Sequence, residues 1–385
     1  MIVFIRSNPV ASDPRVEKEV RSLTAHGFRI MVLAWDREGS FNNLEFSDNR
    51  VICRLRFRAP YGKLVVVAYY PIFWLWVLFK LIRRRPEIVH ACDLDSIFPA
   101  LLYRLLKRDV KVVFDVFDSY GLLVEARSKV LGNMVRSIEL LVASRSDAFI
   151  TVSKERLEFF KGAKLGLTEI VMNCPPSEYS TLYCTKTRKT ARAFRIVYAG
   201  IIASDRGLIE LADATKDISD VEFLVAGRII DSKVLDRLVN FPHVKYVGQL
   251  KFDESLTLEK NTDVIPVLYD PRVPINKTAT PNKLFEAMML GVPIITNLPG
   301  ILEEVQCGIN VCYGDIARIR NAILYLKEHP KVRREMGLKG RLAFEQKYNW
   351  SIMEKKLIDL YDHLLADQAL HYQPFVGSDV VGVQE

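Results

Sequence analysis

A single carboxylate, that of Glu286, lies at the start of a helix predicted within residues 281–297, PNKLFEAMMLGVPIITN. Pro281 and Asn282 mark the beginning of this helix, and a short apolar strand follows it. A carboxylate in the first turn of a helix is favoured by the helix dipole and can accept two hydroxyl hydrogen bonds, as a ribose diol offers. Lys283 and the free amides at the helix start suit a phosphate. The stretch therefore predicts a nucleotide site, although an ordinary strand-helix-strand crossover with a solvated Glu286 fits equally well.

Further candidate ligands of a phosphorylated compound lie around this helix in the second half of the chain. Gly200 follows the predicted strand FRIVYA and allows close approach to the backbone. Arg206 lies near the start of the next predicted helix, where a guanidinium suits a diphosphate, although it could also be a surface charge. The remaining candidates follow a strand or lie in the loop YDPRVPINKTAT, and they are Gly227, Arg228, Asn276, Thr278 and Thr280.

Polar side chains also follow the predicted strands of the first half, at the sheet edge where α/β proteins bind ligands. Asp93 and Asp118 could orient sugar hydroxyls or act as a base. His90 is more simply explained as a hydrogen-bonded core histidine, and Asp115 as a structural anchor. The other candidates at these strand ends are Arg6, Ser7, Asn8, Asp13, Arg15, Asp95 and Tyr120. For those in the first turn, a polar surface turn is an equally good interpretation.

The alternation of strands and helices predicts two Rossmann-like α/β domains, each with a doubly wound parallel sheet. The first turn, SNPVASDP, contains no glycine, so a nicotinamide or flavin enzyme is unexpected. The expected segments are an N-terminal domain (1–175), a linker rich in Pro, Ser, Thr and Lys (176–193), a C-terminal domain (194–350), a terminal helix (351–366) and a loosely ordered tail (367–385).

Composition places the chain among globular proteins, because 49% of its 385 residues are hydrophobic and 26% are charged. The net charge is +8, and the excess of cations lies in the first half. A basic face suits anionic lipid or phosphorylated ligands. Nucleic acid is not an expected partner, because no nucleic-acid-binding motif is present. The six cysteines lack metal-binding spacing, and no signal peptide is recognised, so a cytoplasmic protein is expected.

Residues 64–79 form a stretch without any charged residue, and Lys80 and 83–85 supply cations directly after it. Sixteen residues are slightly short for a bilayer span. We expect 64–85 to make peripheral contact with the cytoplasmic face of a membrane as a helix lying in the lipid interface. Its basic end would lie on the phosphates, and a buried crossover helix is the alternative. The aromatic residues expected to face the lipid are Phe73, Trp74 and Trp76.

Several motifs together resemble the family 4 retaining glycosyltransferases of GT-B fold, over about residues 1–365. They are SDPRVEKEVRSLTAHGF, HACDLD, TVS, YAG…SDRG, FLVAGR, VKYVGQL, PNKLFEAMMLGVPIIT and YNW. The resemblance implies two Rossmann-like domains that face each other across a cleft. The C-terminal domain would hold a nucleotide-diphosphate sugar, UDP- or GDP-linked, and the N-terminal domain the acceptor. The terminal helix would cross back to the N-terminal domain.

The family's acidic motif, two glutamates separated by seven residues, implies that Glu286 binds the ribose hydroxyls. Thr278 stands in place of the first glutamate. Arg206 matches one member of the family's basic pair on the diphosphate, whereas Ile201 stands where many members have arginine. Cys92 aligns with the family's N-terminal-domain histidine, so that Asp93 or a phosphate oxygen would take its role. Lys283 or Arg228 would supply the missing cation.

The resemblance thus implies a retaining hexosyltransferase that acts on a glycan or lipid-linked acceptor. It assigns Asp93, Asp118, Arg206 and Lys283 to catalysis. The acceptor would contact Asn8, Asp13, Arg15, His90 and Tyr120, and the donor would contact Gly200, Gly227, Arg228, Asn276, Thr278, Thr280, Pro281, Asn282 and Glu286, together with Arg206 and Lys283. No cofactor or metal ion is expected, because cations and helix amides can neutralise the diphosphate. A nucleotide-sugar 2-epimerase of the same fold and a non-catalytic nucleotide-sugar-binding protein are the alternatives.

Overall fold

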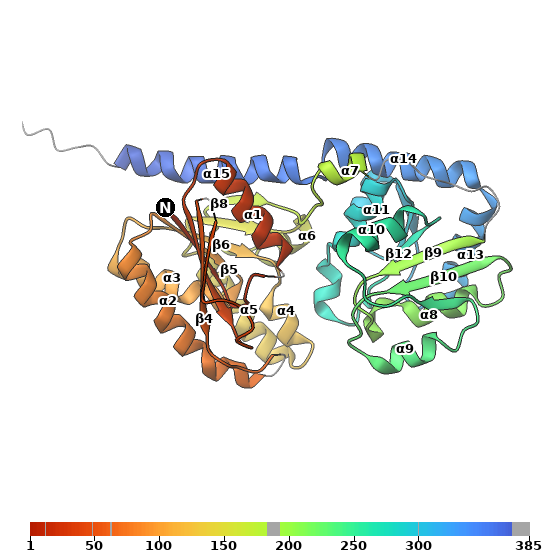
Figure 1. Cartoon of the computed structure of the whole chain (residues 1–385), viewed down its shortest axis with the longest axis horizontal. Helices are drawn as coiled ribbons and strands as arrows, with labels where there is room; N and C mark the ends of the chain where they lie inside the picture. The colour runs from red at the N-terminus through yellow and green to blue at the C-terminus, as the bar shows by residue number, and fades with distance from the viewer. Residues whose placement is uncertain (12, 48, 62–63, 183–192, 299, 372–385) are drawn as a thin grey trace, which may run out of the picture.

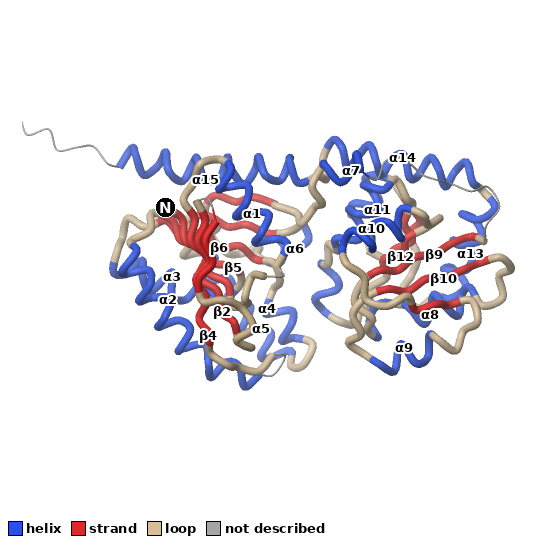
Figure 2. Tube along the Cα trace, viewed as in Figure 1, coloured by secondary structure: helices blue, strands red, loops and turns tan. Residues whose placement is uncertain are grey.

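The computed structural model consists of two domains that lie side by side, with long helices running along one side of both (Figure 1). It describes residues 1–11, 13–47, 49–61, 64–182, 193–298 and 300–371. Both domains have a parallel sheet with helices on its two faces, as the secondary-structure view also shows (Figure 2). The prediction of two doubly wound α/β domains is therefore confirmed.

The N-terminal sheet has the strand order β3-β4-β2-β1-β5-β6-β7-β8. All neighbouring strands are parallel except β3 and β4, which pair antiparallel at one edge. Most residues of β1 and β2 are buried, because helices cover both faces of a parallel sheet. The strands are β1 (Ile2–Arg6), β2 (Ile30–Asp36), β3 (Leu44–Ser47), β4 (Arg50–Arg56), β5 (Ile88–Cys92), β6 (Lys111–Val116), β7 (Ala148–Thr151) and β8 (Leu167–Ile170).

The helices of this domain form one layer on each face of the sheet. Buried side chains of α2, α3 and α5 share one hydrophobic core with the sheet, and those of α1 share the other with the C-terminal helix. The helices are α1 (Pro14–Ala25), the 3-10 turn η1 (Leu64–Tyr69), α2 (Tyr70–Arg84), α3 (Leu94–Leu106), α4 (Tyr120–Glu125), α5 (Lys129–Ala143), α6 (Lys154–Phe159) and α7 (Glu178–Leu182).

The C-terminal domain contains two three-stranded parallel sheets, β11-β10-β9 and β12-β13-β14, which a bridge between Ile196 and Val264 connects. Its strands are β9 (Phe194–Ala199), β10 (Val221–Ala226), β11 (Val244–Tyr246), β12 (Ile265–Val267), β13 (Ile294–Thr296) and β14 (Gly308–Asn310). Its helices are η2 (Ser204–Arg206), α8 (Leu208–Thr215), α9 (Ser232–Leu238), α10 (Phe252–Lys260), η3 (Pro274–Thr278), α11 (Asn282–Leu290), α12 (Ile301–Val305), α13 (Ile316–Glu328) and α14 (Pro330–Gln346).

Helix α2 packs on the sheet through the aromatic residues that the sequence analysis assigned to lipid. Phe73 is fully buried and stacks on Trp35 with ring centroids 5.2 Å apart. Trp74 donates a hydrogen bond of 2.7 Å from its indole nitrogen to the carbonyl of Asp95. The expectation that Phe73 and Trp74 face lipid is therefore wrong. The outward face is apolar, with Leu75 and Phe79 68% and 54% exposed.

By length and composition alone, the helical segment Val65–Arg84 could cross a membrane, with a mean hydropathy of 1.9. Only 22% of it is buried, yet its buried residues belong to the core of the N-terminal domain. The outward apolar face of α2 is consequently the part of the segment that stays accessible.

The expected linker and tail lie partly outside the described residues, since 183–192 and 372–385 are not among them. Within the described part of the linker, residues 178–182 form the short helix α7. The chain then enters β9 at Phe194. The terminal helix α15 (Trp350–His371) begins one residue before the expected position and runs back along the N-terminal domain (Figure 1).

Helix α15 packs on α1 and β8. Hydrogen bonds of Trp350 and of Tyr361 anchor the two ends of this packed segment. The amide of Trp350 donates to the carbonyl of Pro175 at 3.0 Å, and its indole nitrogen donates to the hydroxyl of Ser22 at 2.9 Å. Three turns further on, the hydroxyl of Tyr361 shares a hydrogen bond of 2.6 Å with Nδ1 of His90. Because both partners are fully buried, this bond ties the end of the chain to the interior of the first domain.

We predict that Tyr361→Phe destabilises the protein, because Nδ1 of His90 then lacks its buried partner. Such an unpaired buried group costs about 1–3 kcal/mol. The urea midpoint, followed by circular dichroism, should fall correspondingly. Tyr325→Phe is the matched control, because Tyr325 is 42% exposed. Equal midpoints for the two variants would show that the contact between Tyr361 and His90 contributes nothing to stability.

Candidate active site

The start of α11 contains a buried ammonium between two carboxylates. Nζ of Lys283 lies 2.7 Å from Oε2 of Glu286 and 2.7 Å from Oε1 of Glu259 on α10. Burial raises the pKa of Glu259, whereas the two carboxylates raise the pKa of Lys283 against its own burial. The ammonium of Lys283 therefore points to the two carboxylates. It neutralises one of their two negative charges and fixes the orientation of the Glu286 side chain. Glu259 is a site residue that the sequence analysis missed, because nothing local links it to Lys283.

Local sequence explains why α11 presents these groups. Pro281 precedes the first helical residue with extended backbone, and Gly291 ends the helix at φ +62°, a left-handed conformation that favours glycine. Leu284, Phe285 and Met288 are buried in the hydrophobic core. The core contacts hold α11 in place, and they thereby fix the positions of Lys283 and Glu286 in its first turns.

Arg206 lies against Tyr269 in the same domain as the α11 carboxylate. Its guanidinium lies 4.3 Å from the ring centroid of Tyr269, which follows β12, and it forms an ion pair of 2.5 Å with Asp205. Burial raises the pKa of Tyr269; the charges of Arg206 and Lys283 lower it, and that of Glu286 raises it. Tyr269 was not found from the sequence, although it directly precedes the polar loop that was singled out.

The ends of β9 and β10 lie in close contact beside this site. A Cβ atom at Gly227 would lie 1.8 Å from the carbonyl oxygen of Gly200, and Gly227 has φ +126°. The amide of Gly200 donates to Ala226 at 2.9 Å. Glycine is required at 227, and the hydroxyl of Tyr246 donates to its carbonyl at 3.0 Å. Arg228 follows Gly227 as an exposed residue.

Some polar side chains of the loop before α11, residues 269–280, make hydrogen bonds within the protein. Asn276 is buried and donates 3.0 Å to Asp205 and 3.1 Å to the carbonyl of Asp270. The expectation that Asn276 contacts the donor directly is therefore corrected, because one contact fixes the loop to Asp205 of η2 and the other closes the loop on itself. The partly buried Thr278 offers its carbonyl to Arg156 of the N-terminal domain at 3.4 Å. Thr280 and Asn282 are partly buried or exposed at the start of α11.

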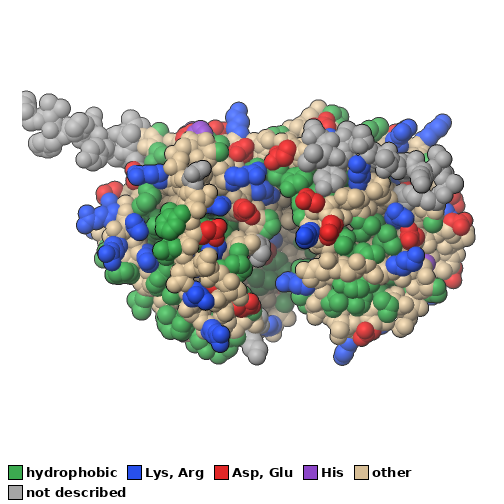
Figure 3. Space-filling model, viewed as in Figure 1, with side chains coloured by type: hydrophobic (Ala, Val, Ile, Leu, Met, Phe, Trp, Pro, Cys, Tyr) green, Lys and Arg blue, Asp and Glu red, His purple; other side chains and the backbone are tan. Residues whose placement is uncertain are grey.

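A pocket of about 420 Å³ lies between the domains and reaches Glu286. Asn282 and Glu286 line it from α11, while Lys18 and Arg21 line it from α1. Burial lowers the pKa of Lys18 to about 8. The space-filling view shows that the surface is hollowed between the two domains (Figure 3). Cations of the first domain thus face the carboxylate of the second across a shared hollow.

The carboxyl ends of the N-terminal strands place Asp93 in a buried, charged setting. Asp93 has φ +67°, forms an ion pair with Arg6, and accepts hydrogen bonds from the amides of Phe117 (2.8 Å) and Asp118 (3.1 Å). Burial raises its pKa from 3.8 to about 7, although Arg6 opposes the shift. Such a carboxyl exchanges a proton near neutral pH, as a general acid or base must.

The remaining candidates of this domain lie around Asp93. Asp118 is exposed and its Oδ1 lies 3.4 Å from Arg156. Asp13 caps α1 and accepts 2.8 Å hydrogen bonds from Arg6 and Asn8. Burial and the neighbouring Asp95 raise the pKa of Tyr120. Asn8 and Asp13 are therefore in contact with each other, and the charged groups that act on Tyr120 are Asp95 and Asp93.

Arg15 and His90 are corrected from acceptor ligands to structural residues. Arg15 is buried, donates to both oxygens of Asp115 at 2.9 and 3.0 Å, and forms an ion pair of 3.1 Å with Glu19. His90 lies 3.4 Å from Asp115 and is fully enclosed, so an acceptor does not reach it. Cys92 is also fully buried.

Glu19, His90 and Asp115 have ligand atoms within 4.8 Å of one another and could hold a metal ion by spacing alone. Arg15 already supplies a positive charge to both carboxylates of this group. The cluster therefore needs no cation from outside to offset its charge.

Two family models match the chain. The model of Glycosyltransferase Family 4 matches residues 15–163, and that of the group 1 glycosyl transferases matches residues 193–329. The two matches together span most of both domains. The chain therefore belongs to the family 4 glycosyltransferases of GT-B fold, and it is a glycosyltransferase. No curated protein sequence matches it.

Solved structures share the fold at low sequence identity. Sucrose-phosphate synthase from Thermosynechococcus elongatus is 18% identical with a TM-score of 0.77, and the match covers 95% of this chain and 100% of that one. HepE from Anabaena in complex with UDP is 14% identical with a TM-score of 0.71, covering 94% and 99%. The trehalose-6-phosphate structure from E. coli bound with UDP-2-fluoro glucose is 10% identical with a TM-score of 0.73, covering 93% and 98%.

We predict that Asp93 makes stability depend on pH. The folded state holds a proton that the unfolded state loses near pH 3.8, so the free energy of unfolding should fall as pH rises from 3.8 to about 7 and then level off. Three pKa units correspond to roughly 4 kcal/mol. Asp93→Asn removes this contribution, so its stability relative to wild type should improve across that range.

Urea unfolding at several pH values measures this difference. Asp236→Asn, at an exposed carboxyl on α9, is the control. If the difference between Asp93→Asn and wild type stays constant with pH, the proposed protonation of Asp93 is wrong.

Proposed function

We propose that this glycosyltransferase moves a sugar, with retention of anomeric configuration, from a nucleotide-diphosphate sugar to an acceptor hydroxyl. The observation that carries the proposal is the interdomain pocket that Glu286 lines, with Lys283 2.7 Å from the Glu286 carboxylate and Arg206 against Tyr269 in the same domain. Two fold neighbours were solved with UDP or a UDP-sugar, which makes UDP-linked sugars the first donors to test and GDP-linked sugars the second.

In the proposed complex, Glu286 accepts hydrogen bonds from the two ribose hydroxyls. Lys283 holds the carboxylate in position through the 2.7 Å contact. Arg206 and the amides at the start of α11 bind the diphosphate, with Gly200 and Gly227 allowing its close approach. This assignment gives Lys283 a positioning role, in place of the direct phosphate contact that the sequence suggested.

Departure of the nucleoside diphosphate places negative charge on the phosphate oxygens. Arg206 and the oriented amides stabilise that charge more strongly in the transition state than in the bound donor, which lowers the barrier. The acceptor hydroxyl attacks from the face that the leaving group vacates and gives its proton to a phosphate oxygen or to Asp93. These groups neutralise the diphosphate without a metal ion.

The acceptor is proposed to be a lipid-linked or membrane-surface glycan, with the enzyme peripheral on the cytoplasmic face of the membrane. The support is the apolar outer face of α2 together with the exposed cations at its end, Arg83 and Arg84. A helix with apolar residues toward lipid and cations toward phosphates binds an interface.

We predict that Glu286→Ala weakens binding of UDP, or of the preferred nucleoside diphosphate, by about 10- to 100-fold. Two hydrogen bonds to a charged oxygen are worth about 1.5–3 kcal/mol each at best, and water replaces part of that value. Isothermal titration calorimetry measures the effect. Glu303→Ala is the control, because Glu303 is an exposed acid in the first turn of α12. Equal affinities of Glu286→Ala and wild type would refute the ribose assignment.

We predict that Leu75→Ser combined with Phe79→Ser lowers binding to liposomes at least about tenfold, since each side chain buried in lipid contributes about 1.5–3 kcal/mol. Leu338→Ser with Leu342→Ser is the matched control, because both residues are exposed on α14 at the same four-residue spacing. Flotation of the purified protein with liposomes measures binding. If the α2 variant floats as well as the control, the membrane contact of α2 is wrong.

A further inference from the structure

A broad apolar face covers the outer side of α2, α3 and α5. These helices connect parallel strands from β4 to β7, so they run in the same direction and end at the same edge of the sheet. Exposed side chains on all three include Leu75 and Phe79 of α2, Leu105 of α3, and Met134 and Leu141 of α5. Figure 3 shows hydrophobic side chains along the lower left of the N-terminal domain, where α2 runs in Figure 1. Contiguous apolar surface of this kind marks an interaction site.

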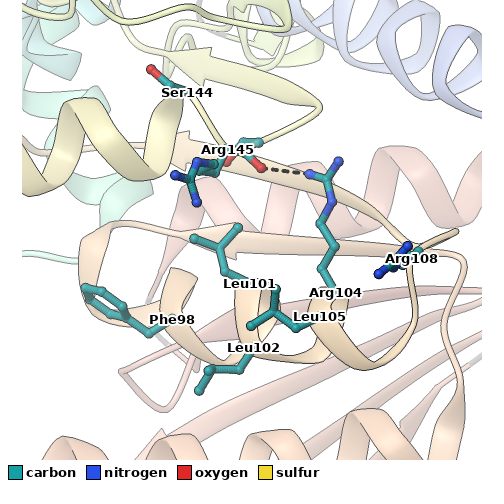
Figure 4. Close-up of a pocket in the computed structure, with 9 residues that line it drawn as sticks. Phe98, Leu101, Leu102, Arg104, Leu105, Arg108, Ser144 and Arg145 are labelled. Atoms are coloured by element: carbon teal, nitrogen blue, oxygen red, sulfur yellow. Dashed lines mark hydrogen bonds between the residues drawn. The ribbon is translucent and has the colours of Figure 1, made fainter.

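A pocket of about 660 Å³ opens in this face between α3 and the turn that follows α5. Its apolar side consists of Phe98, Leu101, Leu102 and Leu105 on α3 (Figure 4). Leu105 is 77% exposed and Leu102 47% exposed, although both lie beside apolar neighbours. The pocket therefore offers a wall of leucines to solvent.

Arg104, Arg108 and Arg145 form the polar side of the pocket. Of these, Arg104 makes hydrogen bonds within the protein. Arg104 donates 2.7 Å to the carbonyl of Arg145 and 3.1 Å to Asp147, which fixes α3 to the turn after α5 (Figure 4). Arg104 thereby donates a hydrogen bond to a carbonyl group just after the end of α5, where cations commonly bind. The guanidinium groups of Arg108 and Arg145 are exposed and make no hydrogen bond or ion pair within the described residues.

We propose that this pocket binds one anionic phospholipid, with the phosphate at its exposed arginines, Arg108 and Arg145, and an acyl chain along Leu102 and Leu105. Guanidinium groups bind phosphate oxygens through paired hydrogen bonds. The leucines exclude a soluble sugar phosphate as the better ligand, because such a ligand would leave the apolar wall in water. A lipid covers both parts of the pocket at once, and charge complementarity selects an anionic headgroup.

The pocket extends the proposed membrane contact of α2, on which this inference rests. Both lie on the same helix layer, so a single flat membrane reaches the pocket and Leu75 together. The cations at the ends of α2, α3 and α5 then meet the headgroups along one edge. The contact would hold the N-terminal domain in one orientation at the surface where a lipid-linked acceptor is presented.

The test is flotation of the full-length protein with two kinds of vesicle, phosphatidylcholine alone and phosphatidylcholine mixed with phosphatidylglycerol. Arg108→Gln with Arg145→Gln should weaken binding to the anionic vesicles about 30-fold and bring it close to the level seen with phosphatidylcholine. Lys233→Gln with Arg237→Gln removes two exposed cations of α9 and should leave binding unchanged. Melting temperatures of all variants should match wild type.

The α2 double variant separates this inference from the proposed membrane contact. If Arg108→Gln with Arg145→Gln floats like wild type while the α2 variant does not, the lipid pocket is wrong and the α2 contact stands. If wild type ignores both vesicles, both proposals fail. Soluble glycerol phosphate should not release the protein from anionic vesicles, and release by it would show a phosphate site without an acyl chain, which overturns the lipid assignment.

Discussion

The contact on which the site depends is the ammonium of Lys283 between Glu286 and Glu259. Two buried carboxylates at this spacing repel each other, and burial alone would disfavour their charge. One lysine offsets part of that cost, since the pKa of Glu259 stays raised to about 7, and it holds the Glu286 carboxylate at the start of α11. The core residues of α11 and the terminal Gly291 hold the helix, and Glu286 lines the interdomain pocket.

The two domains are held together by elements far apart in the chain. Helix α15 begins at Trp350, whose amide donates to the carbonyl of Pro175. Its buried residues then pack in the core of the first domain. On the other side of the hollow, Arg156 reaches the carbonyl of Thr278 just before α11. The first domain thus contacts the loop before α11 directly, and in the proposed function this contact couples domain closure to donor binding and to the exclusion of water during transfer.

Local patterns predicted the architecture and the donor helix well. Alternating apolar runs and turn residues identified the parallel sheets, and Gly291 and Pro281 marked the ends of α11 because helix termini depend on nearby residues. Glu286 was found for the same reason. Glu259 could not be found in this way, because its pairing with Lys283 follows from the packing of α10 on α11.

The errors have the same origin. Arg15 and His90 lie where ligands often bind, yet Asp115, Glu19 and Tyr361 use their polar groups in the interior. Asn276 was a plausible donor ligand until the fold brought Asp205 to it. For α2, composition indicated an apolar helix, but only the position of Trp35 decides that Phe73 faces inward. Partners distant in sequence therefore set the limit of what residue types and spacing predict.

The most direct test of the central claim is a crystal structure of the protein with UDP, or with the nucleoside diphosphate that binds best. The account predicts both ribose hydroxyls within hydrogen-bond distance of Glu286, with Lys283 still between the two carboxylates and the diphosphate beside Arg206 and the start of α11. A nucleotide bound away from Glu286, or a diphosphate that contacts neither Arg206 nor the α11 amides, would contradict it.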